Sequence, residues 1–216
     1  MKKFNNREAA GEELAEKLMI YKNKPCVVMA IPRGGVPVGY AICKQLRCPM
    51  GLVWVKKIGH PLSPELAIGA VSPDDHIIDY KSAASDLYLK NEIEKIRSRF
   101  KEMKKKLNDK SENIDLKDKV IIVVDDGIAT GHTIEAAIKM LRGKTPAKII
   151  VATPVASENA VKNLAFYADE VVVAYVPDIF LGIGGFYTDF TQLSDEETAA
   201  YIKKSERLIM DKKSAL

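Results

Sequence analysis

The sequence predicts an α/β fold in which helices flank a parallel five-stranded core sheet. Apolar strands alternate with segments of helical periodicity along the chain. Residues 120–124 are five consecutive β-branched residues, a pattern typical of a strand buried on both faces of a parallel sheet. The composition, 47% hydrophobic and 29% charged over 216 residues, is that of an ordinary globular protein.

The first part of the chain predicts a strand–turn–helix unit. Apolar residues at helical spacing predict a helix over 7–22. We expect a buried strand over 27–31 and a helix over 38–46. The turn between them is Pro32-Arg33-Gly34-Gly35-Val36-Pro37. Its glycines allow close approach of a ligand to the backbone, and Arg33 offers a charged fork to phosphate oxygens. A tight turn with a surface arginine is the alternative.

The next segment predicts a strand, a loop and a hairpin. Residues 50–55 have the composition of a strand. Residues 58–64 are rich in turn formers and poor in core residues, which is typical of a mobile loop. Two short strands, 65–71 and 76–78, are expected to pair as a β-hairpin.

The remaining elements complete the alternation. One apolar stripe predicts a long helix over 85–108, with charged residues on its outer face. Strands are expected over 147–152 and 170–175, with a helix over 156–166 between them. Acidic residues from Asp195 onward favour the start of a final helix.

Two aspartates, Asp125 and Asp126, directly follow the most apolar strand. Open α/β sheets place their ligands at this end of the strands. The turn that comes next is Ile128-Ala129-Thr130-Gly131-His132-Thr133. Backbone N–H groups at such a turn and at the following helix start can hold a phosphate. A buried strand followed by an N-capped helix is the alternative, although adjacent carboxylates at a buried edge call for a function.

The run from Asp125 to Thr133 resembles the signature of the type I phosphoribosyltransferases: an apolar strand, two acidic residues and a turn ending in Thr-Gly-x-Thr. Residues around His60 and Glu65 resemble a bacterial branch of the family. The resemblance implies a phosphoribosyltransferase-like fold and a site for phosphoribosyl pyrophosphate (PRPP). The two aspartates would address the ribose hydroxyls, and residues 128–133 would wrap the 5′-phosphate.

The same resemblance implies roles for other segments. Pro32, Arg33, Gly34 and Gly35 would bind pyrophosphate. Lys56 or Lys57, at the base of a flexible loop, would meet its charge. A hood over the sheet would bind the acceptor base through Phe180, Phe186 or Tyr187, and Asp178 would approach Mg²⁺. Packing of a subdomain remains the alternative for the aromatic residues, and a plain strand end for the lysines.

The resemblance implies Mg²⁺-dependent transfer of the phosphoribosyl group of PRPP to a nitrogenous base or related acceptor, with release of pyrophosphate. Ala129 departs from the hypoxanthine-guanine members, which carry an aspartate there, and so weakens a six-oxopurine assignment. The acceptor is therefore left open. The alternative is a regulator on the same fold that senses PRPP or nucleotides and binds RNA or DNA.

We expect one domain over 1–216, with a core of about 24–176 and a hood of about 177–193 together with the terminal segments. The formal charge of +4 is weak, and no interleaved aromatic residues favour nucleic-acid binding. No apolar run is long enough to span a membrane, and no secretory signal is visible. Three cysteines are expected to be reduced, as in a cytoplasmic protein. The resemblance is compatible with a homodimer.

Overall fold

The computed structural model describes residues 2–78 and 84–214. Its core is a five-stranded sheet in the order β2-β1-β6-β7-β8, and every pairing in it is parallel. The strands are β1 (Cys26–Ala30), β2 (Met50–Leu52), β6 (Val120–Val124), β7 (Lys148–Val155) and β8 (Glu170–Tyr175). The predicted parallel sheet is confirmed. Strand β2 is shorter than the predicted strand over 50–55. Its pairing with β1 ends where the N–H of Val53 donates to the carbonyl of Ala30, and from Lys56 the chain belongs to a second sheet.

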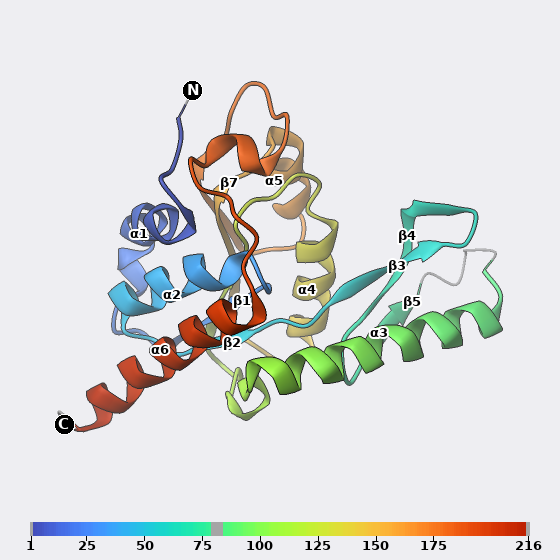
Figure 1. The fold of residues 1–216 in the computed structure, drawn as a ribbon, viewed down its shortest axis with the longest axis horizontal. Helices are drawn as coiled ribbons and strands as arrows, with labels where there is room; N and C mark the ends of the chain where they lie inside the picture. Colours follow the sequence, from blue (N-terminus) through green and yellow to red (C-terminus); the bar gives the residue numbers. More distant parts are fainter. Residues whose placement is uncertain (1, 79–83, 215–216) are drawn as a thin grey trace.

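Two helical layers cover the sheet (Figure 1). Helices α1 (Arg7–Lys17) and α2 (Gly35–Leu46) pack on one face, and α4 (His132–Arg142) and α5 (Glu158–Leu164) on the other. Successive side chains of a strand point to opposite faces. In β6, Ile122 therefore packs with α1 and α2, whereas Ile121 packs with α4 and α5. The run of β-branched residues thus serves both layers.

A second, antiparallel sheet contains β3 (Lys56–His60), β4 (Ser63–Val71) and β5 (His76–Ile78). It packs against α3 (Asp86–Leu107), and Figure 1 shows both projecting from the core. The predicted hairpin of β4 and β5 is confirmed. The predicted mobile loop over 58–64 is wrong, because most of it lies in β3 and β4, and Ile58 is 1% exposed while its backbone pairs with Gly69.

The C-terminal part of the chain, as far as residue 214, contains two helices after the last core strand, and the second of them packs near β2. After β8 it forms the short helix η3 (Ile183–Phe186) and then α6 (Asp195–Ser214). Two other short helices are η1 (Met19–Tyr21) and η2 (Ser111–Asn113). Residues 189–195, which we call the strap, connect the aromatic cluster around Phe186 to the start of α6. Within the described ranges no helix is long and apolar enough to cross a membrane.

Candidate functional site

A cavity of about 550 Å³ lies where the turn after β1, the end of β6 and the strap meet. Five residues predicted for the site line it: Pro32, Arg33, Gly34, Lys56 and Asp126. Further lining residues come from α1, the link between β2 and β3, α3 and the strap, and they are Arg7, Trp54, Val55, Arg99, Phe100, Met103, Phe190, Gln192 and Leu193. The lining contains four cationic side chains and one carboxylate. This excess of positive charge suits an anionic ligand.

The glycine turn lies directly on the end of β6. A Cβ atom added to Gly34 would overlap Oδ2 of Asp126, and one on Gly35 would stand 2.5 Å from the carbonyl oxygen of Val124. Neither arrangement is sterically allowed, so both positions require glycine for space. The peptide bond between Pro32 and Arg33 is cis. The predicted pyrophosphate turn and the predicted acidic pair are therefore in contact.

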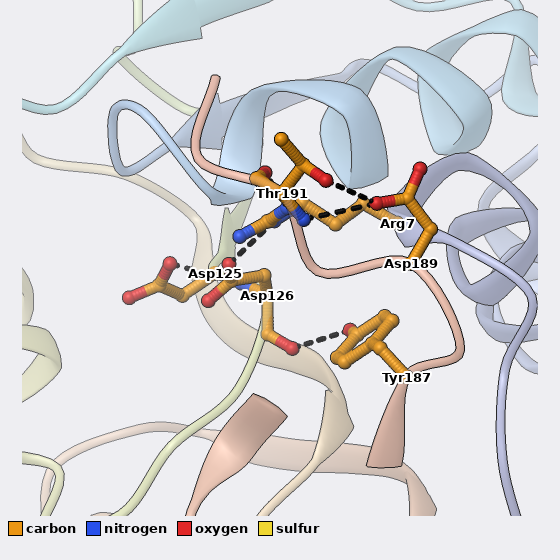
Figure 2. A network of polar contacts seen from close by, with 6 residues as sticks. All are labelled: Arg7, Asp125, Asp126, Tyr187, Asp189 and Thr191. Carbon is orange, nitrogen blue, oxygen red and sulfur yellow. Dashed lines mark hydrogen bonds and ion pairs between the residues drawn. The ribbon is translucent and has the colours of Figure 1, made fainter. Parts of the chain in front are cut away.

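Asp126 is held through its side chain and its main chain. Its Oδ2 accepts a hydrogen bond from Nε of Arg7 at 2.7 Å, and both side chains are only 11% exposed. Its carbonyl oxygen accepts a hydrogen bond from the hydroxyl of Tyr187 at 2.5 Å. Figure 2 shows these contacts reaching Asp126 from two sides. The carboxylate is thus fixed at the cavity wall.

Asp125 has a different environment. Its Oδ1 accepts a hydrogen bond from the backbone N–H of Asp126, and Figure 2 shows its side chain directed away from Arg7. Burial, followed by the charge of Asp126, raises the pKa of Asp125 well above its ordinary value. Burial also raises the pKa of Asp126, although the hydrogen bond from Arg7 opposes this. The predicted pair therefore splits, and of the two only Asp126 lines the cavity.

The predicted phosphate turn is anchored at its start and open at its end. Ile128 donates its N–H to the carbonyl of Val155, and Ser157 donates its hydroxyl to the carbonyl of Ala129 at 2.7 Å. Gly131 has a φ of 81°, which favours glycine, and no side chain caps the start of α4 at His132. Residues 129 and 130 are exposed. The N–H groups at the start of α4 are thus in a suitable position for an anion.

The predicted base-binding residues are placed differently from the expectation. Phe186 and Tyr187 are 2% and 4% exposed and pack with Phe4 in a core cluster. Phe180 is half-buried, and its ring lies 5.5 Å from that of Phe186. This corrects the expectation that Phe186 and Tyr187 line a base pocket, because packing covers their rings. Asp178 is exposed and is not among the residues that line the cavity.

Two features of the site escape the sequence analysis. Arg7 lies 119 residues from its partner Asp126, and no local motif connects them. Arg33 is tied to the strap, since it forms an ion pair with Asp195 at 2.7 Å and donates to the carbonyl of Leu193 at 3.2 Å. The acidic start predicted for the last helix was the only signal near these contacts. Arg7 also donates to the carbonyl of Thr191 at 2.9 Å, so two arginines hold the strap at one side of the cavity.

Comparisons with known proteins show which family and which solved structure the chain resembles. A family model described as "Phosphoribosyl transferase domain" matches residues 2–191, a range that includes Arg7, Asp126 and Phe190. Proteins from two strains of Mycobacterium tuberculosis, each named "Putative phosphoribosyl transferase", are 35% identical to this chain over 96% of its length. The chain spans 48% of their own length, or about half. The crystal structure of TT1426 from Thermus thermophilus is similar, with a TM-score of 0.85, 33% identity, and coverage of 94% of this chain and 98% of that chain.

Proposed function

The chain belongs to the phosphoribosyl transferase domain family, and we propose on this premise that it transfers the phosphoribosyl group of PRPP to a nitrogenous acceptor, with release of pyrophosphate. The observation that supports this most strongly is the cation-rich cavity that has Asp126 in its wall. A donor that carries both a sugar and phosphates needs hydrogen-bond acceptors for the first and cations for the second. The cavity offers both.

In this proposal each segment has one task. Asp126 accepts hydrogen bonds from ribose hydroxyls, and the N–H groups from residue 129 to Thr133 hold the 5′-phosphate, since that of Ile128 is donated to Val155. Arg33 and Lys56, which both line the cavity, neutralise the leaving pyrophosphate. The ribose gains positive character in the transition state while negative charge grows on the leaving group. Fixed charges and positioning therefore provide most of the catalysis.

We include Mg²⁺ in the proposal because of the resemblance to the family, and not because protein side chains form a metal site. Among residues 2–78 and 84–214, no group of three or more His, Cys, Asp or Glu side chains could hold a metal ion. The carboxylate of the cavity lining, that of Asp126, is ion-paired with Arg7. The donor's own oxygens and water would therefore supply most of the ligands, as is usual for Mg²⁺ with phosphates. When bound, the ion would neutralise part of the pyrophosphate charge.

A sensor of PRPP or nucleotides on the same fold is the second candidate. The observation that favours it is a separate hollow of about 590 Å³ beside α3, whose lining contains Arg97, Lys101, Lys104 and Lys105 and the two acidic residues Asp109 and Glu112. Lys104 is ion-paired with Glu112, which leaves three cations and Asp109 in the lining. The remaining excess of cations suits a polyanion. A sensor would bind PRPP without turnover, and its binding of RNA would weaken steeply with salt.

One assay separates the two candidates. The protein is mixed with PRPP, Mg²⁺ and each of a panel of nitrogenous bases, and pyrophosphate release is measured. The transferase proposal predicts release that depends on one class of base and falls at least 100-fold in Asp126→Asn. Glu16→Gln, the same chemical change on the exposed side of α1, is the control and should match the wild type. Release with none of the bases, in a protein that binds PRPP, would favour the sensor.

A further inference from the structure

Asp126 is part of a closed ring of contacts. Arg7 donates Nε to its carboxylate at 2.7 Å. The guanidinium carbon of Arg7 lies 3.9 Å from the ring centroid of Phe190. Phe190 stacks on Tyr187 with centroids 5.0 Å apart and an interplanar angle of 26°. Tyr187 then donates its hydroxyl to the main chain of Asp126, which closes the ring.

This closed set of contacts holds the side chain of Arg7 in one orientation. The side chain of Asn6 caps α1 by accepting from the N–H of Ala9 at 2.9 Å, which fixes the backbone next to Arg7. A second guanidinium nitrogen donates to the carbonyl of Thr191 at 2.9 Å (Figure 2). A guanidinium that is stacked on one ring and bonded at two nitrogens has little freedom left. Arg7 is therefore a rigid support and not a mobile surface cation.

The carboxylate of Asp126 needs such a support. Asp126 is 8% exposed and stands beside a second carboxylate, Asp125. Burial and a neighbouring negative charge both disfavour ionisation. The ion pair with Arg7 counters both effects, and it occupies Oδ2 only. The other oxygen, Oδ1, lies outside this ion pair and can accept a hydrogen bond from a hydroxyl of the ligand.

We infer that Arg7 is a positioning residue, which orients Asp126 and keeps it charged so that it can accept hydrogen bonds from the ribose of the donor. This inference rests on the proposed function. In this inference Phe190 takes part indirectly, by stacking on the guanidinium of Arg7. The segment around Arg7 therefore contributes to donor binding although it is remote from the signature in sequence.

Several charged groups surround the Asp126 carboxylate. Asp125 lies next to it at the end of β6, and Arg7 faces it from α1. The hydroxyl of Tyr187, which comes directly after η3, donates to the carbonyl oxygen of Asp126. Arg33, Lys56 and, from α3, Arg99 line the same cavity. Asp189 of the strap interacts electrostatically with Arg7. Without Arg7, the charge that favours ionisation of Asp126 is lost, while burial and the neighbouring Asp125 still oppose it. Asp126 should therefore ionise, and the donor should bind, only at a higher pH.

The experiment measures PRPP binding in the presence of Mg²⁺ by calorimetry. The variants are Arg7→Lys, Arg7→Gln, Phe190→Leu, Asp126→Asn and the double variant Arg7→Gln/Asp126→Asn. We expect Arg7→Gln to weaken binding at least 10-fold, with smaller losses in Arg7→Lys and Phe190→Leu. In the Asp126→Asn background, Arg7→Gln should add less than twofold, because its target is gone. The acidic limb of the binding profile should move to higher pH in Arg7→Gln. Lys17→Gln, at the exposed end of α1, is the control.

Each outcome is decisive. If wild-type protein binds PRPP and Arg7→Gln binds it equally well, the inference is overturned and the proposed function stands. If the loss in Arg7→Gln persists undiminished in the Asp126→Asn background, Arg7 acts on the donor directly and is not a positioning residue. If wild-type protein does not bind PRPP, the proposed function fails and the inference fails with it. Should Arg7→Gln not fold, Arg7→Lys and Phe190→Leu carry the same comparison.

Discussion

The carboxylate of Asp126 occupies the space beside Gly34 in which a Cβ atom would lie, so no room remains for a side chain at residue 34. The contact joins the turn after β1 to the end of β6, two segments that the sequence separates by about ninety residues. In the proposed mechanism these segments hold the two ends of the bond that breaks. Their contact therefore sets how the ribose and the pyrophosphate lie relative to each other.

Gly34→Ala tests this contact. The new methyl group would overlap Oδ2 of Asp126, so the carboxylate or the turn must move. A displacement of about 1 Å can cost about 100-fold in rate, and we expect a loss of that order in kcat/KM for pyrophosphate release. Gly185→Ala is the matched control, because nothing lies within 4 Å of a Cβ atom there. Equal activity in both variants would contradict the assigned contact.

Asp125→Asn should stabilise the protein at neutral pH. Burial and the charge of Asp126 raise the pKa of Asp125 in the folded state. The folded protein therefore binds the proton of Asp125 more tightly than the unfolded chain does. This tighter binding stabilises the fold fully below pH 3.8, the ordinary pKa, and the stabilisation is lost as pH rises through the folded pKa. Asparagine removes the buried charge but keeps the oxygen that accepts from Asp126.

Thermal unfolding measures the effect of Asp125→Asn, with each 1 kcal/mol worth about 2–4 °C in Tm for a chain of this size. We expect Tm at pH 7 to be higher in the variant than in the wild type, and the difference to shrink as pH falls toward the ordinary pKa of a carboxyl group. A difference that stays constant with pH would show that the Asp125 charge does not cause it.

Lys56 and Lys57 should differ in their effect on donor binding. Successive side chains of a strand point to opposite faces, and in β3 Lys56 lines the cavity while Lys57 is absent from the described lining. A charge-assisted contact to pyrophosphate is worth about 1.5–3 kcal/mol. We therefore expect Lys56→Ala to raise the KM for PRPP about 10-fold or more, and Lys57→Ala to change it less than threefold. The reverse ranking would place the wrong face of β3 at the site.

Tyr187→Phe separates a structural role from the predicted base-stacking role. The variant keeps the ring but removes the hydroxyl that donates to the carbonyl of Asp126. Leaving a buried acceptor unpaired costs about 1–3 kcal/mol, so the midpoint of urea unfolding should fall. The KM for the acceptor base should stay unchanged, because the ring is buried. A higher acceptor KM with unchanged stability would restore the base-binding role.

The sequence predicts the sheet well because each strand carries its own signal. The run Val120–Val124 must be apolar on both faces, and the glycines after β1 mark a turn without reference to any partner. The position of Asp125 and Asp126, directly after the end of β6, follows from the same local pattern. What depends on one segment alone could be predicted.

The missed features depend on contacts between distant segments. Residues 58–64 have the composition of a loop, and only pairing between β3 and β4 makes a strand of them. Arg7 reaches Asp126 from the start of α1, and the strap brings Phe190 onto the guanidinium of Arg7. The aromatic residues after β8 fit a ligand pocket and a core cluster equally well in sequence. Packing against Phe4, a residue from the other end of the chain, decides between the two.

A crystal structure of the protein grown with PRPP and Mg²⁺ tests the central claim most directly. The account predicts ribose hydroxyls within hydrogen-bond distance of the Asp126 carboxylate, pyrophosphate between Arg33 and Lys56, and the 5′-phosphate at the start of α4. Donor bound elsewhere on the chain, or a cavity that stays without donor at saturating PRPP while Arg7 and Arg33 keep their internal ion pairs, would contradict it.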